Sequence, residues 1–440
     1  MRHLFGCLFL LLSCAHLAAQ QSLLQSGPML GYTDLLETVV WVQTTEPAEV
    51  FVSYTELGDA RAETSRTSVV RTERHLGNTA KLTADRVQPG RTYRYAVHIN
   101  GKELSFSYPT IFRTQQLWRW RNDPPEFTVA VGSCSYINEP EYDRPGPGYG
   151  SEYEIFTALD RANPEVMFWL GDNTYLREVD WYTRTGYLHR YTHTRSLPEM
   201  QPLLARTHNL ATWDDHDYGP NNSDRTWIHK ELAKEMFDLF WANPTSGLPG
   251  LGGITTFYQY HDIDFLLLDN RSYRTPNDQK RKDNKTVLGK EQLEWLIESL
   301  IFSQAPYKMV GIGGQVLNTA RAGETYTALA PAERAYLLRR IEEEDISGVV
   351  FLTGDRHHSE LSTLKMGNGK LVHDLTVSSL TAGTGTNRSE VNDLRVDGTL
   401  AVLHNFGLLT FSGPRTERLL TVQLRDKDGK EIWKRELRRE

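Results

Sequence analysis

Five short apolar runs, each followed at once by polar or metal-ligating side chains, constrain the fold of this chain more than any other feature. They are Phe127–Gly132, Glu165–Gly171, Phe265–Asp269, Met309–Ile312 and Gly348–Gly354. Continuous apolar strands indicate that both faces of a sheet are covered, as in α/β folds. Helical stretches lie between the runs, such as Lys290–Phe302 and Pro331–Glu344, where a proline begins the helix. The sequence therefore predicts a large α/β domain.

The chain before this region has a different pattern, in which apolar and polar residues alternate from about Gly31 to Thr114. Segments such as Thr38–Val42 and Tyr93–Ile99 are typical of strands, and Asn100-Gly101 is typical of a hairpin turn. This pattern predicts a β-sandwich of the fibronectin type III kind over residues 22–114. A linker rich in Trp, Arg and Pro, residues 115–126, would join it to the α/β domain, which is expected to span residues 127–440.

Residues 1–19 are typical of a signal peptide, with Arg2 before an apolar run and small residues up to Ala19. The apolar run is too short to span a bilayer comfortably. The segment that ends at Cys14 is similar to a bacterial lipobox, so a lipid anchor at Cys14 and plain cleavage near Ala19 both stay open. Both alternatives predict an exported protein, located in the periplasm, on the outer surface or outside the cell.

Composition and charge exclude several classes of protein. With 39% hydrophobic and 24% charged residues, the 440-residue chain is an ordinary globular protein. Its formal net charge of -7 and the lack of a basic cluster argue against specific nucleic-acid binding. Without the signal segment at most Cys14 and Cys134 remain, so no disulfide framework forms. A lone thiol in an oxidising compartment needs burial or a bound metal.

The polar groups that follow the apolar runs are expected to converge, because ligand sites of open α/β sheets form at the carboxyl ends of the strands. They are Ser133–Ser135, Asp172–Tyr175, Asp214–Asp217, Asn270–Arg271, Gly313–Gln315 and Asp355–His358. Taken singly, each has an ordinary explanation as a helix cap, a packing residue or a surface histidine. Together they predict a dinuclear metal site that activates water and clamps phosphoryl oxygens, with Asp172 as the natural bridging carboxylate.

Three of these groups carry a resemblance to a known family. Gly171–Tyr175, Trp213–Asp217 and Gly354–His357 read Gly-Asp-x-x-Tyr, Trp-Asp-Asp-His-Asp and Gly-Asp-x-His. This series resembles the PhoD family of calcineurin-like metallophosphoesterases, over Phe127 to about Gly385. The resemblance implies an α/β fold with a four-layer α/β/β/α core, preceded by a β-rich domain. It also implies a set of metal ligands, namely Cys134, Asp172, Tyr175, Asp215, Asp355 and His357.

The implied ligands depart from the wider superfamily at several positions. Cys134 stands where the first motif usually has Asp, Asp215 takes an Asn ligand position, and Asp355 stands where a His usually lies. Gln315 falls near the position where the superfamily has a further His ligand. Which residue, if any, fills this ligand position therefore stays open. A thiolate, a phenolate, a carboxylate and an imidazole suit Fe³⁺, whereas oxygen-only sets favour Ca²⁺ or Mg²⁺ over Zn²⁺. The family implies Fe³⁺ and Ca²⁺, with Zn²⁺ or Mg²⁺ as alternatives at one or both positions.

The remaining candidate residues flank these ligands. His216 and Asp214 are the candidate catalytic residues, with His216 as a general acid or a contact to phosphate oxygen. Arg356, Arg271 and Asn222 are candidates for substrate binding. A guanidinium can hold two phosphate oxygens in a fork, but a structural ion pair explains the two arginines equally well.

The sequence thus predicts an exported hydrolase of the alkaline phosphatase type. It would hydrolyse small-molecule, lipid or polymer phosphate esters by attack of a metal-bound hydroxide or oxide on phosphorus. One alternative keeps the fold and makes the protein a phosphodiesterase, including a phospholipase D-like enzyme. The other is a non-catalytic surface-binding protein, against which the nearly complete ligand set speaks. The oligomeric state is not predicted.

Overall fold

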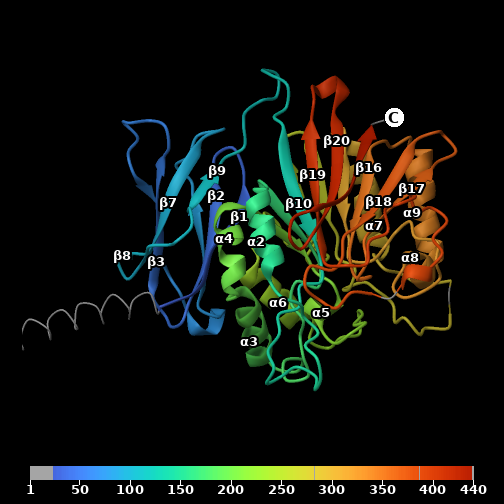
Figure 1. The fold of residues 1–440 in the computed structure, drawn as a ribbon, viewed down its shortest axis with the longest axis horizontal. Helices are drawn as coiled ribbons and strands as arrows, with labels where there is room; N and C mark the ends of the chain where they lie inside the picture. Colours follow the sequence, from blue (N-terminus) through green and yellow to red (C-terminus); the bar gives the residue numbers. More distant parts are fainter. Residues whose placement is uncertain (1–22, 282, 386, 439–440) are drawn as a thin grey trace, which may run out of the picture.

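The computed structural model describes residues 23–281, 283–385 and 387–438, which form three β-sheets and the helices that cover them (Figure 1). The five predicted strands are present as β10 (Phe127–Gly132), β11 (Val166–Leu170), β14 (Ile263–Leu267), β15 (Lys308–Gly311) and β16 (Val349–Thr353). The two predicted helices are α7 (Lys290–Phe302) and α9 (Pro331–Glu343). The predicted signal peptide, with Cys14, lies outside the described residues.

The largest sheet has nine strands in the order β21-β20-β19-β10-β11-β12-β1-β2-β6. Its further strands are β1 (Leu24–Thr33), β2 (Thr38–Thr44), β6 (Thr79–Ala84), β12 (His208–Thr212), β19 (Asn405–Ser412), β20 (Leu419–Asp426) and β21 (Glu431–Arg438). β10, β11 and β12 are parallel, so their carboxyl ends lie at one edge of the sheet. The C-terminal strands pair antiparallel, and a turn at Asp426–Gly429 joins β20 to β21.

The second sheet has the order β13-β14-β15-β16-β18-β17 and packs face to face on the first. Its other strands are β13 (Thr256–Tyr260), β17 (Glu360–Lys365) and β18 (Leu371–Thr376). The rings of Phe168 and Phe265 stack between the two sheets, with centroids 4.2 Å apart. β14, β15, β16 and β18 are parallel, so this sheet also presents several carboxyl ends at one edge.

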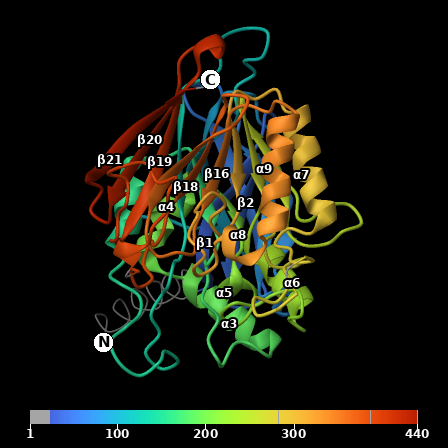
Figure 2. The ribbon, with the colours of Figure 1, turned by 90° about the vertical axis from the view of Figure 1, so that its right-hand side faces the viewer.

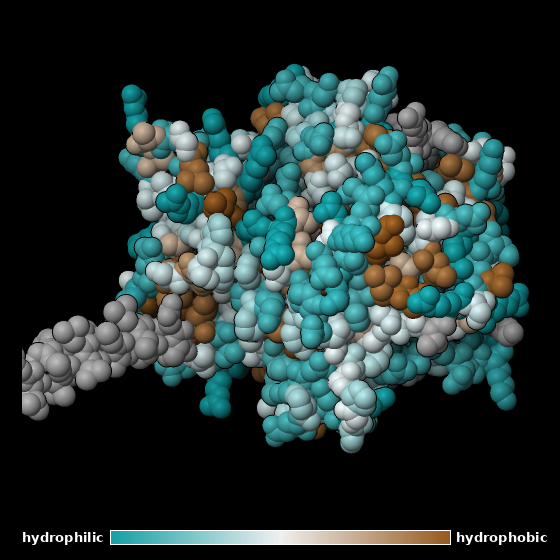
Figure 3. All heavy atoms as spheres, in the orientation of Figure 1, coloured by the Kyte–Doolittle hydropathy of each residue, from teal (hydrophilic) through white to brown (hydrophobic). Residues whose placement is uncertain are grey.

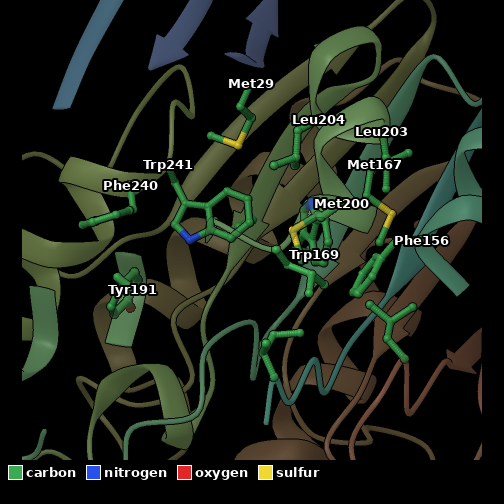
Figure 4. Packing of buried hydrophobic residues seen from close by; sticks show 14 of the residues in the cluster. Met29, Phe156, Met167, Trp169, Tyr191, Met200, Leu203, Leu204, Phe240 and Trp241 are labelled. Carbon is green, nitrogen blue, oxygen red and sulfur yellow. The ribbon is translucent and has the colours of Figure 1, made fainter. Parts of the chain in front are cut away.

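Helices cover the outer face of each sheet. On the nine-stranded sheet lie α2 (Glu154–Ala162), α3 (Arg184–Arg195), α4 (Gln201–Arg206) and α6 (Lys230–Phe240). Figure 4 shows this packing, in which Leu204 of α4 lies near Met29 and Leu203 near Met167. On the second sheet α7 and α9 lie side by side, with α8 (Tyr326–Leu329) next to them (Figure 2). The four layers are those of the predicted α/β/β/α core.

The N-terminal segment forms the predicted sandwich, with one difference in its connection. β3 (Glu49–Glu56) and β7 (Thr92–Ile99) form a small sheet with β4 (Ser65–Arg66), β5 (Val70–Arg71), β8 (Lys102–Glu103) and β9 (Ile111–Arg113). This sheet packs on β1, β2 and β6. However, β1 pairs in parallel with β12, where Leu30 is opposite His208. One sheet of the sandwich therefore continues the core sheet and covers the β12 edge, and the predicted domain boundaries stay a prediction.

Short helices and the surface complete the description. They are α5 (Asp215–Tyr218) and 3-10 turns at Arg74–Leu76, Pro198–Met200, Asn387–Ser389 and Arg415–Glu417. In the part of the chain that the structure describes, no helix has both the length and the apolar character needed to cross a membrane. On the face that Figure 3 shows, apolar residues are scattered among hydrophilic ones.

Trp41 fixes the sandwich to the core helices, so its removal should destabilise the whole protein. The side chain is fully buried in β2, and its ring nitrogen donates to the Leu239 carbonyl at 2.7 Å. Truncation of a buried Trp costs about 3–5 kcal/mol. We therefore expect Trp41→Ala to lower the free energy of unfolding by about that amount in urea titrations. Leu36, which is 64% exposed, provides the control: Leu36→Ala should change it by less than about 0.5 kcal/mol. Equal losses of unfolding free energy in the two variants would contradict the role of Trp41 between the sandwich and the core helices.

Candidate metal centre

The loops that follow β10, β11, β12 and β16 meet at the edge of the sheets where α5 lies, toward the bottom of Figure 1. Four candidate ligands in these loops have left-handed backbone conformations. The φ angles are 59° for Cys134, 52° for Asp172, 66° for Asp355 and 54° for His357. Positive φ is strained for residues other than glycine and persists only where the surroundings impose it, which is common at functional sites. The two sheets thus hold these four side chains in place.

The structure brings the candidate ligands into three overlapping groups. Within each group the possible ligand atoms lie within 4.8 Å of one another. The groups are Cys134 with Asp172 and His357, Asp172 with Asp215 and His216, and Asp214 with Asp215 and Asp355. Asp172 belongs to the first two groups, and Asp215 to the last two. This arrangement could hold two neighbouring cations with Asp172 between them, as a dinuclear site requires.

Neighbouring side chains and a backbone carbonyl orient the ligands of the first group. The Ser378 hydroxyl donates to the Cys134 sulfur at 3.2 Å, and the sulfur lies 3.7 Å from Asp172 Oδ2. Tyr175 Oη donates to the same carboxylate oxygen at 3.2 Å and lies 3.4 Å from His357 Nε2. The other ring nitrogen of His357 faces the Gly383 carbonyl, a contact that orients a ligating imidazole.

Burial raises the pKa of the Cys134 thiol and of the Tyr175 hydroxyl, and the nearby Asp172 raises both further. Both groups therefore stay protonated in the metal-free protein. A metal cation reverses this effect, because a coordinating thiol is deprotonated outright. The first group thus has the donor atoms of a metal site and needs the cation to become charged.

The second half of the centre consists of carboxylates with unsatisfied oxygens. Asp214 Oδ1 accepts hydrogen bonds from Asn270 at 2.7 Å and from Arg271 at 2.5 Å. Asp215 Oδ2 accepts from the Asn222 backbone N–H at 2.6 Å. Asp214 Oδ2 and Asp215 Oδ1 are buried without a hydrogen-bond partner, although the Arg271 guanidinium lies 3.6 Å from Asp215 Oδ1. Buried polar atoms are nearly always paired, so these two oxygens fit an oxygen-coordinated cation.

The electrostatics of the centre also fit bound cations. Burial and neighbouring carboxylates hold the pKa of Asp172 and Asp355 well above the ordinary range. Burial raises the pKa of Asp214 to about 6 although Arg271 opposes the shift. Burial also acts to raise the pKa of Asp215, but Arg271 and His216 hold it below its usual value. Carboxylates that repel one another in this way are stabilised by a nearby positive charge.

The two arginines predicted for substrate binding are held by carboxylates. Arg271 is fully buried, and its guanidinium pairs with Asp214 and, at 2.6 Å, with Glu324. Arg356 pairs with Glu390 at 2.6 Å and donates to Gln315 Oε1 at 3.1 Å. These contacts favour the ion-pair alternative for both residues.

Two other residues predicted to lie at the site, Gln315 and Asn222, form hydrogen bonds with protein groups. Gln315, suggested to lie near a further ligand, uses its amide nitrogen to donate to Glu360 at 2.9 Å and to Thr376 at 2.8 Å. The side chain of Asn222 is exposed, and Asn222 contacts the centre through its backbone N–H. The loop after α5 therefore touches the centre through its main chain.

Three residues with a role in the site were not predicted from the sequence. Asp217 accepts from the backbone N–H groups of Asn173 at 3.2 Å, Thr174 at 2.9 Å and Asp214 at 3.0 Å, and so ties two loops together. Glu324 binds Arg271, and the Tyr149 hydroxyl lies 3.2 Å from His357 Nδ1. Asp217 is part of the Trp-Asp-Asp-His-Asp motif, so the motif could have indicated it. Glu324 and Tyr149 follow no strand or motif.

Comparisons with known proteins agree with this geometry. The PhoD-like phosphatase family matches residues 255–408, and a domain of unknown function, DUF7800, matches residues 21–116. Alkaline phosphatase D of Bacillus subtilis (strain 168) is 24% identical over 339 residues, which cover 66% of this chain and 55% of that protein. The chain thus spans about half the length of this curated relative.

Two solved structures share the fold. A structure of PhoD superposes with a TM-score of 0.73 at 18% identity, covering 93% of this chain and 91% of that one. A purple acid phosphatase, PPD1, from seeds of yellow lupin (Lupinus luteus) superposes with a TM-score of 0.66 at 14% identity, covering 93% and 74%. These superpositions show that the chain shares the fold of PhoD and of the purple acid phosphatase. The match of residues 255–408 to the PhoD-like phosphatase family confirms the predicted resemblance, and the superposition on PhoD confirms the predicted fold class.

Metal removal should destabilise the protein more at about pH 8 than at about pH 5. In the metal-free protein, burial raises the pKa of Asp214, a member of the third ligand group, to about 6 from a usual value of 3.8. Groups with a raised folded-state pKa stabilise the fold at low pH, and this contribution is lost as the pH rises through the folded-state pKa. We expect the difference in Tm between metal-loaded and chelator-treated protein to widen from about pH 5 to about pH 8. A difference that stays constant or narrows would contradict this account.

Proposed function

We propose that this protein is a metal-dependent phosphoesterase that hydrolyses phosphate esters at the centre formed by the three ligand groups. The observation that carries the proposal is the pair of buried oxygens without a hydrogen-bond partner, Asp214 Oδ2 and Asp215 Oδ1, beside a carboxylate shared between two groups. Such a site suits two cations, which clamp phosphoryl oxygens and activate water. The similarity to a protein named alkaline phosphatase D supports the same reaction.

For the metals, we propose Fe³⁺ at Cys134, Asp172, Tyr175 and His357, because thiolate, phenolate and imidazole donors gather there. At Asp215 and Asp355 we propose Ca²⁺, with Mg²⁺ or Zn²⁺ as the alternatives, because the donors there are carboxylates. Asp172 would contribute to both positions, since it belongs to two of the groups.

His216 is proposed to contact the substrate. Its ring stacks on Tyr175 with centroids 4.3 Å apart, and its backbone N–H donates to Asp172 Oδ1 at 3.1 Å. Burial lowers the pKa of His216, so the imidazole is neutral at alkaline pH. A neutral ring can donate a hydrogen bond to a phosphoryl oxygen, and this favours the phosphate-contact role over that of a general acid.

Asp214 is proposed as a positioning residue. One of its oxygens is bound by Arg271 and Asn270, which leaves the other to face the cation site. The Arg271–Glu324 ion pair would hold Asp214 in this orientation. We also propose export, based on the signal-like residues 1–19, and a lipid anchor at Cys14 stays one of its two forms.

Parallel assays with a chromogenic monoester and a chromogenic diester test the proposed function. Turnover of the monoester supports a phosphatase, and preference for the diester supports the phosphodiesterase alternative. If the metal-loaded protein hydrolyses neither substrate, the proposal is wrong and the non-catalytic binding protein is the better account.

Replacement of Cys134 by Ser should remove the soft donor of the first site with little change in volume. We expect Cys134→Ser to lose iron, any thiolate or phenolate charge-transfer colour, and activity, while its circular dichroism spectrum stays that of the wild type. A Cys134→Ser protein that keeps both iron and turnover would overturn the Fe³⁺ assignment. Ser135→Ala is a matched control, because Ser135 neighbours Cys134, is buried like it and is not among the predicted ligands.

Replacement of His216 tests whether it contacts substrate or holds metal. If it donates to a phosphoryl oxygen, His216→Ala should lower kcat/KM by about 10- to 100-fold, as expected for a hydrogen bond to a charged group. Metal content, measured by mass spectrometry, should remain that of the wild type. Loss of a metal together with activity would instead make His216 a ligand, as its place in the second group allows.

A further inference from the structure

A cavity of about 440 Å³ opens beside the metal centre, and several aromatic rings contribute to its lining. Its lining includes Tyr136, Tyr142, Tyr149, Tyr175, Trp181 and His216. The volume is within the range of about 300–1,000 Å³ typical of small-molecule sites. A larger hollow of about 1330 Å³ lies between the linker and α7. None of the residues that line the larger hollow belongs to the ligand groups, so it is not a substrate site for this centre.

The position of the smaller cavity determines which part of a substrate would enter it. Tyr175 and His216 line the cavity and also touch Asp172, the carboxylate shared by two ligand groups. A phosphate ester whose phosphoryl group lies at the centre therefore extends its alcohol portion past these two rings. The cavity is thus the leaving-group side of the proposed site.

The ring faces are not all available to a ligand. The Arg177 guanidinium lies 4.0 Å from the centroid of Tyr136, and the Tyr175 ring stacks on His216. Tyr142, Tyr149 and Trp181 make edge-on contacts with other rings, and none of the three has a parallel-stacked partner among the described contacts. Tyr149 is 48% exposed. Rings that are open on the cavity side offer stacking surfaces to a planar group.

The charges that line the cavity balance one another, so they do not favour a polyanionic group there. Arg177 is paired with Asp143 at 2.9 Å, and Asp143 also accepts from the Tyr136 hydroxyl at 2.7 Å. These groups therefore satisfy one another. Arg144 and Glu178, of opposite sign, also line the cavity. The described lining thus offers rings and charges of both signs and has no cluster of cations.

The loop that carries the rings is held in place before any ligand binds. The Asn138 side chain donates to the Gly150 carbonyl and accepts from the Gly150 N–H, both at 2.8 Å, and so closes the loop between them. Glu139 pairs with the buried Arg190 of α3 at 2.7 Å. Preorganised walls of this kind reduce the entropic cost of binding.

We propose that this cavity binds a planar aromatic group on the alcohol side of the phosphate ester, and that its natural substrates are therefore nucleotides. This inference rests on the proposed function. Stacking of a base on aromatic side chains accepts any base, because every base has a π-face. The rings therefore select for the presence of a base and leave its identity open.

Three monoesters of primary alcohols test the proposal, namely ribose 5-phosphate, adenosine 5′-monophosphate and benzyl phosphate. They share the type of leaving oxygen and differ in the attached group, which is a sugar, a nucleoside and a phenyl ring. We expect kcat/KM for adenosine 5′-monophosphate to exceed that for ribose 5-phosphate by about tenfold or more. Equal values would overturn the proposal. A preference for benzyl phosphate over adenosine 5′-monophosphate would show that the cavity selects aryl groups and overturn the nucleotide assignment.

Variants at Tyr149 assign the preference to the ring. Tyr149→Leu should reduce the ratio of the two kcat/KM values for adenosine 5′-monophosphate and ribose 5-phosphate toward one, and Tyr149→Phe should preserve it. Loss of the Tyr149 hydroxyl contact to His357 should affect both substrates equally, so this effect cancels in the ratio. Tyr142→Leu is a second ring deletion and should lower the same ratio. Phe302→Leu removes an 85% exposed ring on α7 and should leave it unchanged.

Direct binding separates this inference from the proposed function. Binding of adenosine, which has no phosphate, is measured by equilibrium dialysis with the metal-loaded protein. Adenosine that binds the wild type and binds Tyr149→Leu at least about fivefold more weakly supports the cavity assignment even if no ester is hydrolysed. Hydrolysis of ribose 5-phosphate without any adenosine binding would leave the phosphoesterase intact and contradict the nucleotide proposal.

Discussion

Repulsion among buried carboxylates is the constraint on which the rest of this structure depends. Asp172, Asp214, Asp215 and Asp355 lie in overlapping groups at the edge of two sheets, and burial together with this repulsion raises the pKa of Asp172 and of Asp355. Arg271 offsets part of this charge but is itself shared with Glu324. Cations bound between the carboxylates account for an arrangement that would otherwise be unfavourable.

The framework around the centre is built to hold this arrangement. Parallel strands of two packed sheets end in left-handed residues that carry the ligands. Asp217 fixes the loops after β11 and β12 to each other through three backbone N–H groups. The sandwich contributes from the side, because β1 covers β12, the strand that leads into Asp214 and Asp215. Substrate-free protein would therefore already have the geometry of the site.

Much of the core could be predicted from the sequence because its signals are local. The apolar runs of β10 and β16 and the helix over Lys290–Phe302 depend on neighbouring residues, and their boundaries agree closely with the structure. Convergence of Cys134, Asp172 and His357 followed from a general property of α/β sheets. The prediction that these residues converge required no knowledge of distant contacts beyond that property.

The rest could not be predicted because it depends on contacts between distant segments. The parallel pairing of β1 with β12 joins residues far apart in sequence, and the alternation of apolar residues does not show which edge a strand occupies. Arg271 is suited to phosphate by its position beside the ligands, yet Glu324, in a loop without a motif, binds it. Tyr149 likewise reaches His357 from an irregular loop.

The most direct test of a dinuclear centre is the metal content of the purified protein, measured by inductively coupled plasma mass spectrometry for wild type and Asp172→Asn. The account predicts about two metal ions per wild-type chain and loss of both in Asp172→Asn, because Asp172 is shared between two ligand groups. Asp283→Asn, at an exposed carboxylate, should retain both. A metal-free wild-type protein that still hydrolyses phosphate esters, or an Asp172→Asn protein with unchanged metal content, would contradict the account.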